Sequence, residues 1–234
     1  TIIISSSSSL IMIIVHHLEN SRSQRVLWLL EELAIPYEIK NYQRDKKTML
    51  APASLKAVHP LGKSPVITDA GKTIAESGAI TEYLIHHYGP DSMKFDVGSE
   101  AWLQGTYWSH FAEGTAMPFL VMKLVFSQIK RAPMPFFVKP VAGQIVNKVM
   151  SSFLQPNIDN TLAYINDHLQ GKTWFVDETL SAADFQMSFP LLAAAAREDI
   201  PAQYPNIQRY LERMQQRPAF QKAIEKGGPL QVMS

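Results

Sequence analysis

The pattern of apolar residues changes near residue 90, and this change constrains the fold of the 234-residue chain more than any other feature. Before it, two strand-like runs at residues 12–17 and 37–42 flank a helical segment. Apolar residues recur in that segment at helical spacing, at Val26, Leu29, Leu30 and Leu33. This order predicts a β–α–β unit.

Two further strands and a helix complete the first domain. The runs at residues 65–69 and 72–75 are joined by an Asp-Ala-Gly-Lys turn, which is typical of a hairpin. A helix is predicted to start at residues 76–77 and to end before Gly89–Pro90. We therefore expect an α/β domain of the order βαβ–ββα over residues 12–89.

The chain beyond a linker at residues 90–98 is predicted to be helical. The expected helices cover residues 99–129, 140–170 with a break at Pro156, 181–196 with a kink at Pro190, 207–216 and 218–226. A segment with three prolines, residues 131–140, is expected to be a loop between long helices. The second domain, residues 99–234, is thus expected to be all-helical.

The first eleven residues differ in composition from the rest. Three isoleucines and five serines lack the cationic start and the long apolar stretch of a signal peptide. We interpret residues 1–11 as an artificial or upstream remnant and Met12 as the natural start. Because no run of about 18 apolar residues occurs, no membrane span is expected, and a cytoplasmic location is the default.

Composition excludes several chemistries. The chain has no cysteine, so it forms no disulfide, cysteine–zinc site, iron–sulfur cluster or cysteine nucleophile. The 22 basic and 21 acidic residues give a net charge of +1, which argues against nucleic acid or an anionic membrane as the main partner.

Two motifs resemble functional sites but lack required parts. Gly62-Lys63-Ser64 is not a phosphate loop, since Ala57 occupies the position of the first glycine and a strand follows. His16 and His17 are neighbours on a strand, so their side chains point to opposite faces. No third ligand accompanies His110 and Glu113 at helical spacing, so no metal site is expected.

Three segments carry candidate binding groups. A fixed turn at Ser64–Pro65, of the kind that a cis bond forms, would expose the backbone of Ser64 to an extended peptide ligand; an ordinary strand-opening proline is the alternative. The helix start at Glu76–Ser77 would hold a carboxylate on its N–H groups and an ammonium on Glu76; a plain N-cap is the alternative.

The third segment, Asn20-Ser21-Arg22-Ser23, lies between the first strand and the first helix. A serine hydroxyl donating to a ligand's thiolate would lower the pKa of that thiol. Helix capping by Asn20, Ser21 or Ser23 is the alternative, and both roles are compatible.

Two further groups have structural interpretations. Ser181 and Asp184 match a capping box before an apolar helix, and we interpret them as structural. Tyr107, Trp108 and Phe111 belong to an aromatic-rich helix, where they form the core or line an apolar pocket that faces the first domain.

The chain resembles the cytosolic glutathione transferases, over essentially residues 12–226. The resemblance rests on four motifs in order: NSRSQRVLWLLEELAIPYE (20–38), HPLGKSPVI (59–67), AESGAITEYL (75–84) and TLSAADF (179–185). It implies a thioredoxin-like N-terminal domain with a cis proline (Pro65), an all-helical C-terminal domain and a homodimer. The pattern is similar to the serine-type bacterial and fungal members.

The resemblance also implies roles for individual residues. By motif, Lys63 corresponds to the residue that reaches the glycyl end of glutathione, and Ser64 to the residue whose backbone pairs with the cysteinyl part. Glu76 and Ser77 correspond to the pair that holds the γ-glutamyl group. Asp184 corresponds to the structural aspartate of the family.

The catalytic residue is less clear from the motifs. Histidines, a leucine and a glutamate stand where tyrosine-type members carry their tyrosine, and cysteine-type chemistry is excluded. Alignment through Val26 places Asn20 at the position of the catalytic serine and Ser21 one position later. We expect Ser21 to act on the sulfur, with Asn20 as the alternative.

Three functions are therefore considered. The first is transfer of glutathione to a small hydrophobic electrophile, in a cytoplasmic detoxifying enzyme. The second is glutathione-dependent reduction of disulfides or peroxides, with glutathione supplying every thiol. The third is a non-catalytic, transferase-like interaction module.

Overall fold

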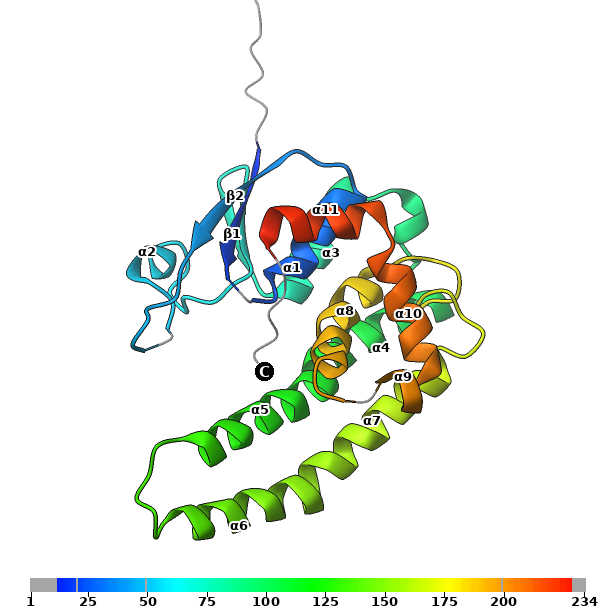
Figure 1. The fold of residues 1–234 in the computed structure, drawn as a ribbon. Helices are drawn as coiled ribbons and strands as arrows, with labels where there is room; N and C mark the ends of the chain where they lie inside the picture. The colour runs from blue at the N-terminus through cyan, green and yellow to red at the C-terminus, as the bar shows by residue number, and fades with distance from the viewer. Residues whose placement is uncertain (1–11, 20, 49, 199, 229–234) are drawn as a thin grey trace, which may run out of the picture.

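The computed structural model describes residues 12–228 except 20, 49 and 199, and it consists of a sheet-containing N-terminal domain and a helical C-terminal domain (Figure 1). The predicted remnant at residues 1–11 and the candidate Asn20 therefore lie outside the described residues. No helix among the described residues is long and apolar enough to cross a membrane.

The N-terminal domain contains one four-stranded sheet in the order β2-β1-β3-β4. Its elements are β1 (Ile13–Leu18), α1 (Ser23–Glu32), β2 (Tyr37–Tyr42), α2 (Ala53–Lys56), β3 (Val66–Asp69), β4 (Lys72–Ala75) and α3 (Ser77–Tyr88). Strand β2 runs parallel to β1, whereas β3 and β4 are antiparallel additions. The predicted βαβ–ββα order is confirmed.

Alternation along β1 divides its side chains between two cores. Ile13 and Val15 join the main core, which also contains buried residues of α1 and α3. Leu18 belongs to a smaller cluster with Tyr42 of β2 and Leu55 of α2, on the other face. The two neighbouring histidines are separated in the same way, as predicted.

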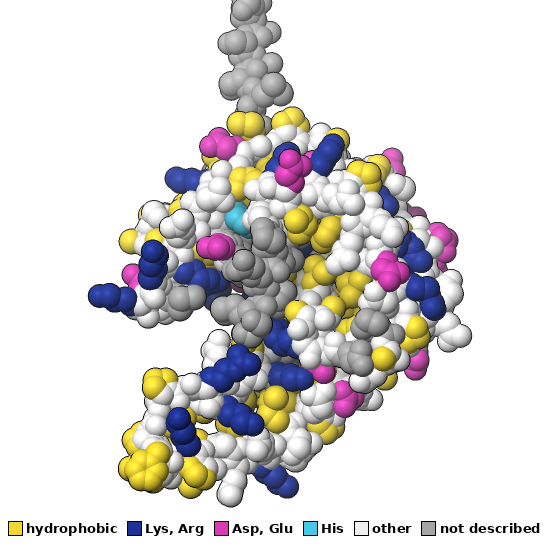
Figure 2. Space-filling model, in the orientation of Figure 1, with side chains coloured by type: hydrophobic (Ala, Val, Ile, Leu, Met, Phe, Trp, Pro, Cys, Tyr) yellow, Lys and Arg dark blue, Asp and Glu magenta, His cyan; other side chains and the backbone are white. Residues whose placement is uncertain are grey.

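The C-terminal domain is helical throughout its regular structure. Its elements are α4 (Glu100–Phe111), α5 (Met117–Arg131), α6 (Lys139–Val149), α7 (Gln155–His168), α8 (Ala182–Ala195), α9 (Ile200–Gln203), α10 (Pro205–Gln215) and α11 (Pro218–Gly227). π-Helical turns at Ala112–Ala116 and Met150–Leu154 connect α4 to α5 and α6 to α7. Helices α5 and α6 form an arm, and the molecule is hollowed between this arm and the N-terminal domain (Figures 1 and 2).

Local expectations differ from the structure in three places. The predicted break at Pro156 is wrong, because the π-helical turn Met150–Leu154 continues directly into α7, in whose first turn this proline lies. The predicted capping of α1 holds for Ser21, whose Oγ accepts the N–H of Ser23, whereas Arg22 occupies the N-cap position and makes no capping bond through its side chain. Helices α2 and α9 were missed because four residues are too short to show a period.

The two domains share their core across α1. The Trp28 ring of α1 packs 4.5 Å from that of Phe185 in α8 and 5.6 Å from that of Phe220 in α11. Arg217 donates to Glu32 at the same contact, with Nη2 2.8 Å from Oε2. The last helix thus returns to the N-terminal domain and fixes the position of α1.

Candidate functional site

A cavity of about 210 Å³ lies where the β1–α1 segment, the turn before β3 and the start of α3 meet. The residues that line it are Arg22, His59, Leu61, Lys63, Ser64, Pro65, Ala75, Glu76, Ser77 and Glu113. Four of them, Lys63, Ser64, Glu76 and Ser77, are the binding residues expected from the sequence. These four residues, up to 14 positions apart in the chain, therefore line one space.

The turn before β3 supplies the first wall. The Ser64–Pro65 peptide bond is cis, as expected. Pairing between β1 and β3 begins at Val66, so the backbone of Ser64 lies beyond the ladder. The Ser64 hydroxyl donates to the carbonyl of His16 at 2.8 Å and accepts the N–H of Leu18 at 3.2 Å, which ties the turn to the end of β1.

The start of α3 supplies the second wall. Glu76 has a φ of 71°, a left-handed conformation that is strained for a residue with a side chain and that is often found at binding sites. The N–H groups of the first turn of a helix have no acceptor within the helix, and they favour an anion. The Ser77 hydroxyl donates to Gln186 Oε1 of α8 at 3.2 Å, so its proton is already engaged.

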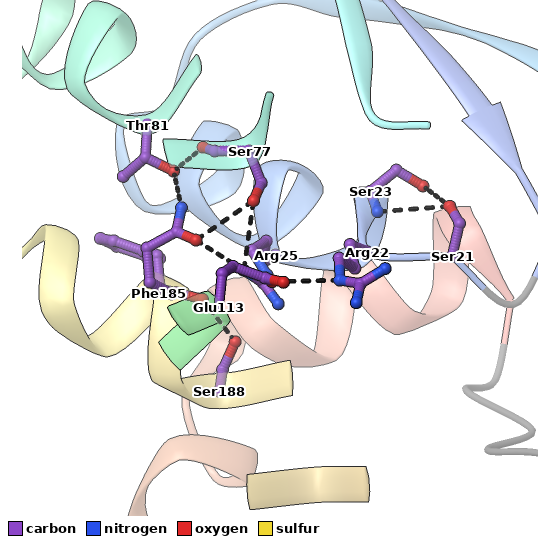
Figure 3. A network of polar contacts seen from close by, with 10 residues as sticks. Ser21, Arg22, Ser23, Arg25, Ser77, Thr81, Glu113, Phe185 and Ser188 are labelled. Atoms are coloured by element: carbon purple, nitrogen blue, oxygen red, sulfur yellow. Dashed lines mark hydrogen bonds and ion pairs between the residues drawn. The ribbon is translucent and has the colours of Figure 1, made fainter. Parts of the chain in front are cut away.

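Ser21 lies directly behind the cavity, in contact with the lining residue Ser64. Its Oγ lies 3.2 Å from Ser64 Oγ and 2.7 Å from Ser23 Oγ, and the side chain is only 7% exposed (Figure 3). Ser21 Oγ also accepts the N–H of Ser23 at 3.3 Å, the first residue of α1. The sequence candidate for the sulfur is therefore held beside the cis-proline turn by hydroxyl groups.

A charged group from the C-terminal domain closes the cavity. Glu113, in the turn between α4 and α5, accepts from Arg22 Nε at 3.0 Å and lies 2.9 Å from Arg25 Nη1 (Figure 3). Arg25 is fully buried, and burial lowers the pKa of its guanidinium to about 10, so it stays charged at neutral pH. Its Nη1 also donates to Gln186 Oε1 at 2.5 Å, which joins α1 to α8.

The aromatic candidates lie elsewhere on α4. Trp108 is buried, with its ring 4.9 Å from that of Phe111 and 5.4 Å from that of Tyr164. The Tyr107 hydroxyl donates to that of Tyr164 at 3.2 Å. None of the three candidates is among the residues that line the cavity at α3.

The capping box at the start of α8 is confirmed. The Ser181 side chain accepts the N–H of Asp184, and the Asp184 carboxylate accepts the N–H of Ser181. Asp184 Oδ1 also accepts the N–H of Phe175 at 3.0 Å. Burial raises the pKa of this carboxyl to about 6, although its hydrogen bonds act in the opposite direction.

Sequence reasoning missed Arg22, His59, Leu61 and Glu113 as lining residues. Arg22 lay inside a motif that had drawn attention only for its hydroxyl and amide groups. Glu113 is 91 positions from its partner Arg22, and no local pattern links residues that far apart.

The two neighbouring histidines of β1 point to opposite faces, as predicted. His16 bonds to Tyr42 and Thr68, whereas His17 bonds to Ser23 and Gly227. Among the residues that the structure describes, no three potential His, Asp or Glu ligands cluster closely enough to hold a metal ion.

Comparison with known proteins identifies the family. Residues 11–86 match the model of the glutathione S-transferase N-terminal domain, and residues 135–218 match that of the C-terminal domain. The chain is 39% identical over 215 residues to glutathione S-transferase 3 of Schizosaccharomyces pombe, covering 92% of this chain and 88% of that protein. It is 32% identical over 224 residues to glutathione S-transferase 1 of Saccharomyces cerevisiae, covering 92% and 95%.

A solved structure gives the same result. The crystal structure of a glutathione S-transferase from Actinobacillus pleuropneumoniae superposes with a TM-score of 0.74 at 34% identity, covering 94% of this chain and 95% of that one. The N-terminal domain is therefore thioredoxin-like, as the resemblance implied. The chain belongs to the glutathione transferase family and is an enzyme of that family.

Proposed function

We propose that this enzyme binds glutathione in the cavity at α3 and stabilises its thiolate for addition to a hydrophobic electrophile. The observation that carries the proposal is the convergence of Lys63, Ser64, Glu76 and Ser77 on one cavity, with Ser21 at its border. The four residues come from two motifs, residues 59–67 and 75–84, and the resemblance assigns Lys63 to the glycyl end, Ser64 to the cysteinyl part and the other two to the γ-glutamyl group.

The charges of the cavity complement those of glutathione, which carries two carboxylates, one ammonium and one thiol. The N–H groups at the start of α3 would hold the γ-glutamyl carboxylate, and Glu76 would accept from the ammonium. Lys63 would pair with the glycyl carboxylate. The backbone of Ser64 would pair with the cysteinyl residue, which places the sulfur on the side of Ser21.

Ser21 is the residue that we propose to act on the sulfur. A hydroxyl that donates to the thiolate favours ionisation, and each unit by which the thiol pKa falls corresponds to about 1.4 kcal/mol. The start of α1, two residues away, adds a favourable dipole. Asn20 remains the alternative donor.

The remaining parts of the proposal concern the partners. We propose that a small hydrophobic electrophile binds on the helical side, near Tyr107 and Phe111, where proximity accelerates its reaction. Trp108, the third residue expected there, is only 2% exposed and belongs to the core. Exposed apolar side chains along the α5–α6 arm, Val121, Val125, Val141 and Ile145, support association into a homodimer. Sedimentation of the full chain at two concentrations tests that association. A cytoplasmic location and a role in detoxification stay predictions.

Binding and ionisation test the proposal together. Calorimetry should give saturable binding of glutathione, and the thiolate absorbance of the complex should titrate below the free-thiol pKa of about 8.5. Ser21→Ala should shift that titration upward. Ser127→Ala is a matched control, since its hydroxyl bonds only within α5, to the Lys123 carbonyl.

The outcomes separate the candidate functions. Absence of binding at millimolar glutathione would favour a non-catalytic module. An unchanged titration in both Ser21→Ala and Asn20→Ala would remove both residues as sulfur donors. Faster disulfide reduction than conjugation on one preparation would favour the reductase.

A further inference from the structure

A chain of hydrogen bonds leads inward from Ser21 and joins it to Ser23, His17 and Gly227. Ser21 Oγ lies 2.7 Å from Ser23 Oγ, Ser23 Oγ lies 2.6 Å from His17 Nδ1, and His17 Nε2 lies 2.9 Å from the carbonyl oxygen of Gly227. Ser23 is fully buried and His17 is 5% exposed. The chain therefore leads from the border of the cavity through two buried side chains to the half-buried end of α11.

The last acceptor fixes the tautomer of His17. A carbonyl only accepts, so His17 Nε2 must carry a hydrogen. In the neutral ring Nδ1 then has a free lone pair, and Ser23 must donate its hydroxyl proton to it. Burial lowers the pKa of His17, which keeps the ring neutral at neutral pH and leaves Nδ1 able to accept.

The same reasoning sets the direction of Ser21. Ser23 has given its proton to His17, and Ser64 has given its own to the His16 carbonyl. Both neighbours of Ser21 Oγ can therefore only accept from it, and the nearer one, Ser23 Oγ at 2.7 Å against 3.2 Å for Ser64 Oγ, takes the Ser21 proton. In this state Ser21 presents an acceptor, not a donor, to a ligand in the cavity.

We propose that His17 receives the proton of the glutathione thiol through Ser23 and Ser21, and that this transfer turns Ser21 into the donor that stabilises the thiolate. The proposal rests on the proposed function. The S–H bond breaks and its proton joins Ser21 Oγ; the Ser21 proton moves to Ser23 Oγ, and the Ser23 proton moves to His17 Nδ1. No electrons are exchanged, and the products are a thiolate and an imidazolium.

The transfer reverses both hydroxyl bonds. His17 Nδ1–H then donates to Ser23, Ser23 donates to Ser21, and Ser21 donates to the sulfur anion. His17 and Ser23 are positioning residues in this scheme, because neither touches the ligand.

The groups around His17 act on its pKa in both directions. Burial has the largest effect and lowers the pKa, whereas the bond to the Gly227 carbonyl and the charge of Glu19, directly after β1, raise it. Lys226, which precedes Gly227 in α11, is paired with Glu31 of α1. The Ser23 and Gln24 side chains at the start of α1 are uncharged. The new thiolate adds a favourable negative charge two hydroxyl groups away.

The end of α11 is fitted closely to this position. A Cβ on Gly227 would lie 2.5 Å from Leu27 Cδ1 and 2.6 Å from Gln24 Oε1. A side chain would therefore push the carbonyl away from His17. Glycine allows the C-terminal helix to approach α1 closely enough to supply the acceptor.

Nitrogen NMR of the full-length protein labelled in its histidines tests the proposal. The His17 signals are assigned by their loss in His17→Asn. Adding glutathione at neutral pH should convert the His17 Nδ1 shift from that of a neutral ring to that of an imidazolium. S-methylglutathione, which has no thiol proton, should leave the ring neutral. A neutral His17 beside a thiolate observed by absorbance would overturn the proposal.

Three variants add a readout that a structural role would not change. Ser23→Ala interrupts the chain, so glutathione should leave His17 neutral. His17→Asn keeps an acceptor for Ser23 but takes no proton, and the pKa of the bound thiol should rise by about one unit, a tenfold change. His16→Asn replaces the neighbouring buried histidine on the other face and should change neither.

The experiments distinguish failure of the proposed function from failure of the proton relay, which is the transfer from the thiol through Ser21 and Ser23 to His17. Calorimetry with both ligands reports binding independently of His17. If neither ligand binds, both proposals fall. If both bind with wild-type affinity in Ser23→Ala, and His17 is still protonated by glutathione in that variant, the relay alone is wrong.

Discussion

The starts of α3 and α8 contain the same two residue types, a serine and a carboxylate, but use them differently. At α8, Ser181 and Asp184 bond to each other's backbone and are almost completely buried. At α3, the side chain of Glu76 makes no capping bond, its backbone is strained, and it lines a cavity. The start of α8 is capped by its own side chains, whereas the start of α3 has no side-chain cap and can offer its N–H groups to a ligand.

This difference separates a stabilising role from a binding role. A closed capping box stabilises the fold because every buried polar group has a partner. An open start costs stability, since strain and unpaired N–H groups remain until an anion arrives. Substitutions at α8 should therefore affect folding, and those at α3 should affect affinity.

The largest expected effect is at the closed start. Asp184→Asn replaces an acceptor of several buried N–H and O–H groups by an amide whose NH₂ faces those donors. We expect the free energy of unfolding to fall by about 3 kcal/mol. Urea denaturation measures it. A loss of under 0.5 kcal/mol would contradict the structural role.

Glu76→Gln should give the converse result at the open start. Losing the carboxylate removes the partner of the ligand's ammonium, so we expect glutathione affinity to fall about tenfold to 100-fold, or 1.4 to 3 kcal/mol. Stability should stay within about 0.5 kcal/mol. Calorimetry measures the affinity, with Glu82→Gln, an exposed carboxylate farther along α3, as a control of equal charge. Equal losses in both variants would show a nonspecific charge effect.

The buried carboxyl should also give a distinctive pH dependence. Its pKa of about 6 in the folded state lies above the ordinary value of 3.8, so the native state binds the proton more tightly. The contribution of Asp184 to stability should thus fall as the pH rises from about 4 to about 6, by about 3 kcal/mol, and then stay constant.

Unfolding free energies of the wild type and of Asp184→Asn across that range isolate this contribution. The difference between the two proteins should narrow as the pH rises. A difference that widens would mean that the carboxyl is ionised more readily in the folded state than in the unfolded state.

The smallest effect is expected at the edge of the cavity. Arg22 and Glu113 are each about one-third exposed, at 37% and 35%, so their ion pair contributes less than about 1 kcal/mol to stability. Arg22→Gln should weaken glutathione binding a few-fold, and the weakening should shrink at high salt because exposed charges are screened. Titrations at two ionic strengths measure this. A salt-independent loss would point to a direct, desolvated contact.

Regular local patterns made most of the fold predictable. The helical spacing of Val26 to Leu33 gave α1, and the turn between β3 and β4 gave the hairpin. The capping box of α8 was readable because both partners lie within one helical turn. Short elements such as α2 and the π-helical turns carry no period and were missed.

The site was predictable only where a motif carries it. Lys63, Ser64, Glu76 and Ser77 were expected at one site because their neighbours in sequence indicate a turn or a helix start, and all four line one cavity. The partnership of Glu113 with Arg22 and the bond between His17 and the Gly227 carbonyl join residues 91 and 210 positions apart. Tertiary packing decides such contacts, and a single sequence does not report it.

A crystal structure of the complex with glutathione tests the central claim most directly. We predict the γ-glutamyl carboxylate on the N–H groups at the start of α3, the ammonium beside Glu76, and the sulfur within hydrogen-bond distance of Ser21 Oγ. Glutathione bound elsewhere, or in this cavity with its sulfur turned away from the Ser21 side, would contradict the account.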